Sequence, residues 1–359
     1  MKKIYINGRF LTQNITGVQR YAVEMVKALD RHLDTDELSS KYKFEIVCPK
    51  NIKQKIELNN IKIKQIGILK GHLWEQIELP LYAKSNFLFN FCNCAPLIKK
   101  NQVVTIHDAA VCAVPEAYSF LFRIWYKTMF YILGYRLNRI FTDSMFSKQE
   151  LHKYFFIDLK KIDVIYLGVE HILKIKPDEK VFDKFQIKKN SYILAVSSLN
   201  PSKNFKLILK TAKEMPDTNF VIAGGTNSSI FKSKGLPVTD NVKFIGYVND
   251  EELVALYKYA SCFVYPSLYE GFGIPPLEAM VFNCPTIVSN IEVFKEVYSN
   301  DVIICDNNDF NLLNKIKYVK SLKKKNFYHK NVNDILIKYS WDKVGKTVLD
   351  LIRNIEYEK

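Results

Sequence analysis

The feature that most constrains the fold of this chain is an alternation of short apolar runs with amphipathic helical stretches, which occurs twice. The first series of β-type runs extends from Lys3–Ile6 to Ile162–Tyr166, and the second from Tyr192–Ser197 to Val302–Cys305. Strands that alternate with helices form parallel sheets with helices on both faces. A polar, charged interval from Gly168 to Asn190 separates the two series. The sequence therefore predicts an α/β protein with two Rossmann-like, doubly wound lobes.

The same alternation predicts where the lobes begin and end. We expect a first lobe at residues 1–180, a second lobe at 181–340, and a final amphipathic helix at 341–359 that crosses back to pack on the first lobe. A chain of 359 residues is long enough for two cores. In doubly wound sheets, ligands bind beyond the carboxyl ends of the strands. We therefore expect the two lobes to face a central cleft.

Charge and composition limit the partners of the chain. The formal net charge of +15 suits nucleic acid, an anionic membrane or a phosphorylated ligand, although a lysine-rich coding bias would also produce it. The lysines are spread along the chain and no nucleic-acid-binding motif is found, so we expect no nucleic acid partner. No apolar run reaches the roughly 18 residues of a membrane span. The seven cysteines stand mostly in apolar settings, which favours buried thiols and a cytoplasmic location.

One segment raises the question of membrane contact. Phe120–Tyr131 mixes aromatic side chains with Arg123 and Lys127, which lie one helical turn apart. Such a mixture suits a helix at a membrane interface, and it also suits a core helix with a charged outer edge. The first interpretation predicts a peripheral protein on the cytoplasmic face of the inner membrane, and the second predicts a helix whose aromatic residues are buried.

The strongest functional signal is the segment Tyr265–Glu278, in which a strand is followed by a glycine-containing loop and a helix. Pro276 suits the first turn of a helix, and the free N–H groups of such a turn attract phosphate. Glu270 and Glu278 stand on either side of this turn. A carboxylate accepts two hydrogen bonds from a vicinal diol, so the pair could hold a ribose and a sugar. The alternative is a solvated loop charge at Glu270 and a helix-dipole partner at Glu278.

Glu270 and Glu278, with seven residues between them, resemble the paired-glutamate signature of retaining glycosyltransferase family 4, which has the GT-B fold. Leu73–Gln76 with the following Leu79-Pro80 is similar to a segment of the polysaccharide-assembling branch of that family. The resemblance covers nearly the whole chain, and its other matching segments are Thr16–Tyr21, Asn101–Asp108, Thr142–Ser147, Ser267–Gly273, Leu277–Met280 and Ser340-Trp341.

The resemblance implies a role for each matching residue. The catalytic positions are His107, beside the transferred sugar, and Glu270, on the hydroxyls of the donor sugar. Glu278 would bind the nucleotide ribose, Lys203 would hold the diphosphate, and Gly17 would present a backbone N–H to it. The remaining donor-binding residues are Gly271, Phe272, Gly273 and Ile274, and the secondary candidates are Ser198, Arg20, Asp108 and Gly224.

One position departs from the family pattern. Many members carry an arginine where this chain has Ser198, so Lys203 would neutralise the diphosphate with less help. Arg20 or Arg9 could supply a second cation. Because many polysaccharide-assembling members also lack that arginine, its absence does not imply an inactive protein.

The expected reaction is transfer of a sugar, with retained anomeric configuration, from a GDP-, UDP- or dTDP-sugar to a glycan or polyprenyl-diphosphate-linked acceptor. The product would be a surface polysaccharide such as capsule, O-antigen or exopolysaccharide. We expect no cofactor and no metal, since Asp34 and Asp36 lie in a polar loop that precedes a strand. Two alternatives remain open. A sugar-nucleotide epimerase of GT-B fold would convert a nucleotide-sugar without an acceptor, and a non-catalytic sugar-binding subunit would bind the donor without releasing nucleotide.

Overall fold

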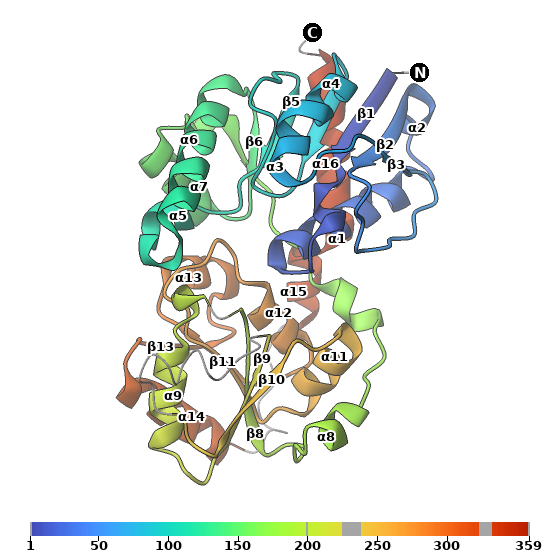
Figure 1. Ribbon diagram of the computed structural model, residues 1–359. Helices are drawn as coiled ribbons and strands as arrows, with labels where there is room; N and C mark the ends of the chain where they lie inside the picture. Colours follow the sequence, from blue (N-terminus) through green and yellow to red (C-terminus); the bar gives the residue numbers. More distant parts are fainter. Residues whose placement is uncertain (1, 199, 225–237, 323–331, 358–359) are drawn as a thin grey trace. The chain divides into compact units, whose positions relative to one another are not determined.

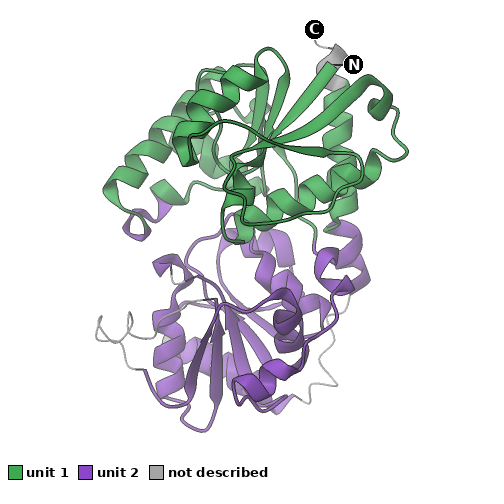
Figure 2. Cartoon of the chain, turned by 45° about the vertical axis from the view of Figure 1, so that its right-hand side comes forward, with its two compact units in different colours: residues 1–112, 118–168, 339–359 green, residues 113–117, 169–338 purple. Residues whose placement is uncertain are grey.

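The computed structural model describes residues 2–198, 200–224, 238–322 and 332–357. The chain forms two compact units, which are described here one at a time. Unit 1 comprises residues 1–112, 118–168 and 339–359, and unit 2 comprises residues 113–117 and 169–338 (Figure 2).

Unit 1 is built on a parallel sheet of seven strands among its described residues, in the order β3-β2-β1-β4-β5-β6-β7 (Figure 1). The strands are β1 (Lys2–Asn7), β2 (Tyr42–Cys48), β3 (Lys62–Gln65), β4 (Phe87–Asn90), β5 (Gln102–Thr105), β6 (Ile140–Thr142) and β7 (Ile162–Val164). The helices are α1 (Gly17–His32), α2 (Leu38–Lys41), α3 (Gly71–Leu73), α4 (Leu79–Ala83), α5 (Ala110–Ala113), α6 (Phe120–Arg136), α7 (Met145–Phe155) and α16 (Trp341–Tyr357).

Unit 2 is built on a second parallel sheet, in the order β10-β9-β8-β11-β12-β13. Its strands are β8 (Tyr192–Val196), β9 (Asn219–Ala223), β10 (Val242–Gly246), β11 (Cys262–Tyr265), β12 (Thr286–Ser289) and β13 (Ile303–Cys305). Its described helices are α8 (Lys180–Lys184), α9 (Phe205–Lys213), α11 (Asp250–Tyr259), α12 (Ile274–Val281), α13 (Glu292–Tyr298), α14 (Asp309–Ser321) and α15 (Val332–Lys338). The prediction of two Rossmann-like, doubly wound lobes is confirmed.

The final helix packs inside unit 1, where α16 lies along α1 (Figure 1). Two glycines make the close approach possible. A Cβ atom at Gly345 would lie 2.9 Å from the Ala28 side chain, and one at Gly168 would lie 2.2 Å from the Trp341 backbone nitrogen. Trp341 is 1% exposed, so burial of this large ring fastens the helix to the unit.

The boundary between the units lies earlier than expected from the sequence. The chain passes into unit 2 after Gly168, whereas a boundary at residue 180 would cut into α8. Tertiary hydrogen bonds explain the difference, because the Asp178 N–H donates to the Glu251 carbonyl at 2.9 Å. The Lys184 ammonium also lies 2.7 Å from the Glu252 carboxylate. These contacts tie the charged interval to α11.

Two further details differ from the sequence prediction. The return to unit 1 begins at Tyr339 rather than at residue 341, and Ala113–Ala117 belongs to unit 2. Residues 71–83 do not form one regular helix but are divided into α3, a π-helical turn at Trp74–Glu78, and α4. In the part of the chain that the structure describes, no helix is both long enough and apolar enough to cross a membrane.

Candidate functional site

The loops of unit 2 converge where the strand order reverses, between β8 and β11. Such a reversal creates the ligand crevice of doubly wound sheets, beyond the carboxyl ends of the strands. The turn Pro201–Lys203 follows β8, and the glycine-containing loop follows β11. The Leu268 N–H donates to the Ser202 carbonyl at 2.7 Å, which fastens one loop to the other. This hydrogen bond brings the segments that carry Lys203 and Glu270 together.

Lys203 and Glu270 form an ion pair at this position. The Lys203 ammonium donates to Glu270 Oε1 at 2.6 Å, and the two side chains are 19% and 10% exposed. The same ammonium lies 5.7 Å from the centroid of the Tyr265 ring. Burial and the neighbouring Glu270 carboxylate raise the pKa of Tyr265 well above its usual range, so its hydroxyl remains a donor toward that carboxylate. The sequence predicted both charged residues but not their pairing.

Glu278 is held at both of its oxygens. The Tyr257 hydroxyl donates to Oε2 at 3.0 Å, and His171 Nε2 lies 3.2 Å from Oε1. Burial and the Glu278 carboxylate raise the pKa of Tyr257, which keeps this hydroxyl protonated. Sequence reasoning missed both partners, because Tyr257 reads as a core residue of α11 and His171 lies in the interval taken as a linker.

The glycine-containing loop ends in a strained turn before α12. Gly273 has φ +95°, and a Cβ atom there would lie 2.6 Å from the Tyr298 hydroxyl, which donates to the Gly273 carbonyl. Gly273 is the N-cap of α12, and a proline occupies its first turn. Gly271, Phe272 and Ile274 are buried beside it, so this loop has a defined shape.

Two further candidates follow neighbouring strands. Ser198 is exposed beyond β8, and Gly224 follows β9. Gly224 has φ +97°, and a Cβ atom there would lie 2.7 Å from the Ser197 carbonyl oxygen, which requires glycine at this position. The sequence Gly224-Gly225-Thr226 at the end of a predicted strand could line a base pocket, but Gly225 and Thr226 lie outside the described residues.

In unit 1, His107 follows β5 and is 5% exposed. Its Nδ1 atom lies 2.8 Å from Asp143 Oδ2, and its Nε2 atom lies 3.1 Å from the Phe91 carbonyl oxygen. Burial is the largest single influence and lowers the pKa of His107, but Asp143, Asp108 and the Phe91 carbonyl together raise it by more, so the net shift is upward. Both ring nitrogens face acceptors, an arrangement that favours the protonated form of the ring. Its hydrogen-bonding capacity is therefore used within unit 1.

The other unit 1 candidates lie at turns. Gly17 begins α1 and is exposed, and a Cβ atom there would meet no atom within 4 Å. Arg20 lies one turn further along, 3.9 Å from the Glu24 carboxylate. Asp108 Oδ1 accepts from the Ala110 N–H at 2.8 Å and so stabilises the turn after His107.

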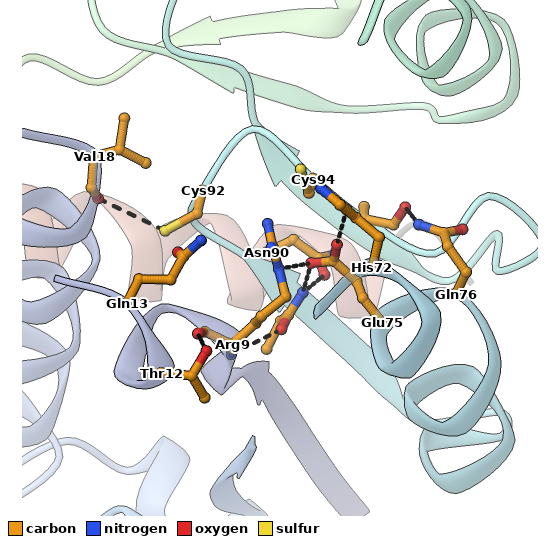
Figure 3. A network of polar contacts seen from close by, with 12 residues as sticks. Arg9, Thr12, Gln13, Val18, His72, Glu75, Gln76, Asn90, Cys92 and Cys94 are labelled. Carbon is orange, nitrogen blue, oxygen red and sulfur yellow. Dashed lines mark hydrogen bonds and ion pairs between the residues drawn. The ribbon is translucent and has the colours of Figure 1, made fainter. Parts of the chain in front are cut away.

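A buried polar network lies at the strand-order reversal of unit 1, between β1 and β4, and Figure 3 shows Arg9, His72 and Glu75 directed toward one another. Glu75 Oε1 accepts from Asn7 Nδ2 at 2.7 Å and from Arg9 Nε at 3.1 Å. Although burial raises the pKa of Glu75, the Arg9 guanidinium together with His72 and Asn7 outweighs this effect, and the net pKa is lowered. Arg9 is therefore committed to Glu75, which disfavours the idea that Arg9 contacts phosphate.

The same network contains the one described group of three side chains with metal-ligand chemistry, His72, Glu75 and Cys94, whose ligand atoms lie within 4.8 Å of one another. Arg9 already balances the charge of Glu75. Burial raises the pKa of Cys94 to about 12, so its thiol is neutral at physiological pH. The charges of this group are therefore satisfied by the chain itself.

Helix α6 exposes an apolar face. Met129, Phe130 and Leu133 are buried against the unit 1 core, so one face of the helix is structural. The large hydrophobic residues of α6 that are exposed at the surface are Phe120, Leu121, Phe122, Ile124, Tyr131 and Tyr135. The expectation of a helix with only a charged outer edge does not account for this face.

Comparison with known sequences identifies a domain in unit 2. The family described as "Glycosyl transferases group 1" matches residues 177–333. The O-antigen chain mannosyltransferase RfbU of Salmonella typhimurium is 28% identical over 322 residues, which cover 85% of this chain and 87% of that protein. The O-antigen chain mannosyltransferase B of Escherichia coli is 28% identical over 324 residues, which cover 82% of this chain and 84% of that protein.

Comparison with solved structures identifies the fold. HepE of Anabaena, solved in complex with UDP-glucose, superposes with a TM-score of 0.73 at 14% identity, over 99% of this chain and all of that chain. WaaG, a glycosyltransferase involved in lipopolysaccharide biosynthesis, superposes with a TM-score of 0.70 at 12% identity, over 98% of this chain and 99% of that chain. The fold of the chain is therefore the GT-B fold.

Proposed function

This chain is a glycosyltransferase of GT-B fold with a group 1 domain in unit 2, and we propose that it transfers a hexosyl residue from a nucleotide-sugar with retained anomeric configuration. The observation that carries the proposal is the convergence of Lys203, Glu270 and Glu278 on the loops and helix that follow β8 and β11. One ammonium and two carboxylates at a strand-order reversal match the parts of a nucleotide-sugar, which are a diphosphate and two polyols.

Each side chain then has one task. Lys203 binds the diphosphate, assisted by the Gly273 and Ile274 N–H groups at the start of α12, where Pro275 and Pro276 carry none, and by the Gly17 N–H. Glu278 binds the ribose, and Glu270 binds hydroxyls of the transferred sugar. The Lys203–Glu270 ion pair of 2.6 Å keeps both groups oriented before the donor arrives. Gly271, Phe272, Gly273 and Ile274 shape the surface against which the sugar and diphosphate lie.

The proposed reaction is a front-face displacement without a metal ion. The acceptor hydroxyl oxygen forms a bond to the anomeric carbon while the bond from that carbon to the diphosphate oxygen breaks. The hydroxyl proton passes to the departing diphosphate. Lys203 and backbone N–H groups neutralise the leaving charge. The contacts of the Glu270 carboxylate with Lys203 and Tyr265 support a role on the sugar hydroxyls rather than as a nucleophile.

His107 supports this reaction in a fixed orientation. Its ring is anchored by Asp143 and by the Phe91 carbonyl, and the Tyr21 ring packs edge-on at 4.8 Å. The contribution we propose is electrostatic, from the His107 backbone carbonyl oxygen toward the positive charge that develops on the transferred sugar. Asp108 maintains the turn that presents this carbonyl.

The acceptor we propose is a glycan, carried on a polyprenyl diphosphate, in the assembly of a surface polysaccharide. Two relatives named as O-antigen mannosyltransferases support this substrate class. The exposed apolar face of α6 supports peripheral attachment to the cytoplasmic face of a membrane, since apolar side chains beside lysine and arginine favour an anionic interface. Co-sedimentation with anionic vesicles should fall as salt rises, and an absence of binding at low salt would leave a protein without membrane contact.

The donor is tested by thermal shift with UDP-, GDP- and dTDP-sugars, each in excess chelator. A ligand at a hundred times its dissociation constant adds about 2.7 kcal/mol to the stability of the folded protein. We expect one nucleotide class to raise the melting temperature with chelator present. If a nucleotide-sugar is converted without any acceptor, the protein is an epimerase instead. If it binds the donor and never releases nucleotide when acceptor is present, it is a binding subunit.

A further inference from the structure

The contacts of Glu278 have a chemical consequence for the residues around it. His171 Nε2 lies 3.2 Å from Oε1, the Tyr257 hydroxyl lies 3.0 Å from Oε2, and the Glu278 side chain is 9% exposed. An ionised carboxylate offers about four lone-pair sites, two on each oxygen. Among the described residues one contact reaches each oxygen, which leaves one site on each for a ligand. The free sites are therefore a matched pair, suited to two adjacent hydroxyl groups.

The two partners also fix the orientation of the carboxylate. Glu278 lies on the eight-residue helix α12, while Tyr257 lies on α11 and His171 lies in the turn Glu170–Lys174. Hydrogen bonds from two separate elements to the two oxygens determine the carboxylate plane. Without them, a side chain with three rotatable bonds would have to be ordered by the ligand itself, at a cost in affinity.

We infer that His171 and Tyr257 are positioning residues that hold Glu278 ready to recognise the 2′ and 3′ hydroxyls of the donor ribose. This inference rests on the proposed function, because it assumes that Glu278 meets a nucleotide. His171 and Tyr257 act through Glu278 and do not touch the reacting atoms. Their loss should raise the KM for the donor and leave kcat at saturating donor nearly unchanged.

Ribose selectivity separates this role from a purely structural one. The probes are UDP and GDP, each compared with its 2′,3′-dideoxy counterpart by calorimetry. Hydrogen bonds to a charged group correspond to about a ten- to a hundredfold preference for the ribose form in the unaltered protein. In Tyr257→Phe and His171→Leu, this preference should fall to within about threefold, while affinity for the dideoxy form changes little. His171→Gln, which keeps an N–H donor, should restore most of it.

The control is Tyr259→Phe. Tyr259 lies on the same helix, and its hydroxyl lies 2.6 Å from the carboxylate of the exposed Glu179. This variant should keep the full preference. Tyr257→Phe preserves the ring and its packing, so it remains informative if His171→Leu folds poorly. Retention of the ribose preference in Tyr257→Phe and in the folded His171 variants would overturn the inference. Binding of none of UDP, GDP and dTDP by the unaltered protein would refute the proposed function itself. Binding of dTDP alone, which has no 2′ hydroxyl, or equal binding of the ribose and dideoxy forms would refute only the inference.

Discussion

Removal of the negative charge at Glu75 should destabilise unit 1 severely while leaving its shape intact. Glu75→Gln keeps an oxygen that can accept from Asn7, but it leaves the Arg9 guanidinium without a counterion. The Arg9 and Glu75 side chains are only 9% and 1% exposed, so water cannot compensate. Breaking a buried ion pair from one side typically costs about 3–5 kcal/mol.

This cost is large enough to measure by calorimetry. For a unit of this size, each kcal/mol lowers the melting temperature by about 2–4 °C, so the expected decrease is roughly 6–20 °C. The double variant Arg9→Met with Glu75→Gln should regain a substantial part of the loss, since no unpaired charge remains. The control is Lys153→Ala, which removes the ion pair of Lys153 with Glu150. Because Lys153 is 61% exposed, this variant should leave the melting temperature unchanged. If the Glu75→Gln variant has the same melting temperature as the unaltered protein, the claim that this pair neutralises a buried charge is refuted.

Lys203→Ala should weaken binding of both nucleoside diphosphate and nucleotide-sugar. Glu270→Ala should reduce turnover, but it releases the Lys203 ammonium and should therefore leave nucleoside diphosphate binding intact or stronger. Equal losses of diphosphate affinity in the two variants would contradict the assigned roles. Gly17→Ala should not lower thermal stability, since a Cβ atom there meets nothing within 4 Å. Alanine keeps the backbone N–H, but its Cβ atom would crowd the approaching phosphate, so calorimetry should detect weaker diphosphate binding. The His107 pKa is raised in the folded state, so the His107–Asp143 pair stabilises unit 1 fully below about pH 6.5 and loses that contribution as pH rises through the raised value. Urea titrations from about pH 6 to pH 9 should therefore show a decline that Asp143→Asn removes, and parallel curves for the two proteins would contradict it.

The sheets and several helices followed from local signals. The alternation of apolar and helical runs predicts a strand at Cys262–Tyr265 and a helix at Asp250–Tyr259, and the structure gives β11 and α11 these bounds. α11 has a capping box in which the Asn249 side chain accepts from the Glu252 N–H at 2.8 Å, which is a signal within four residues. Where the hydrophobic period, the turn residues and the caps agree, the sequence is sufficient to predict the type and the bounds of an element.

What could not be predicted depends on contacts distant in sequence. The π-helical turn at Trp74–Glu78 breaks a regular helical pattern, and Glu75 at this turn bonds Asn7 and Arg9, which are more than 60 residues away. The pairing of His107 with Asp143 spans 36 residues. A family resemblance gave a role to Glu278, but neither spacing nor periodicity points to His171, because its function depends on where a turn packs in three dimensions.

The most direct test of the account is the anomeric configuration of the newly formed linkage, determined by NMR and repeated in excess chelator. We predict that the product has the same configuration as the sugar in the donor and that the rate is unchanged by chelator, because Lys203 and backbone N–H groups neutralise the leaving diphosphate. An inverted product, or activity that chelator abolishes and magnesium or manganese restores, would contradict the proposed site and mechanism.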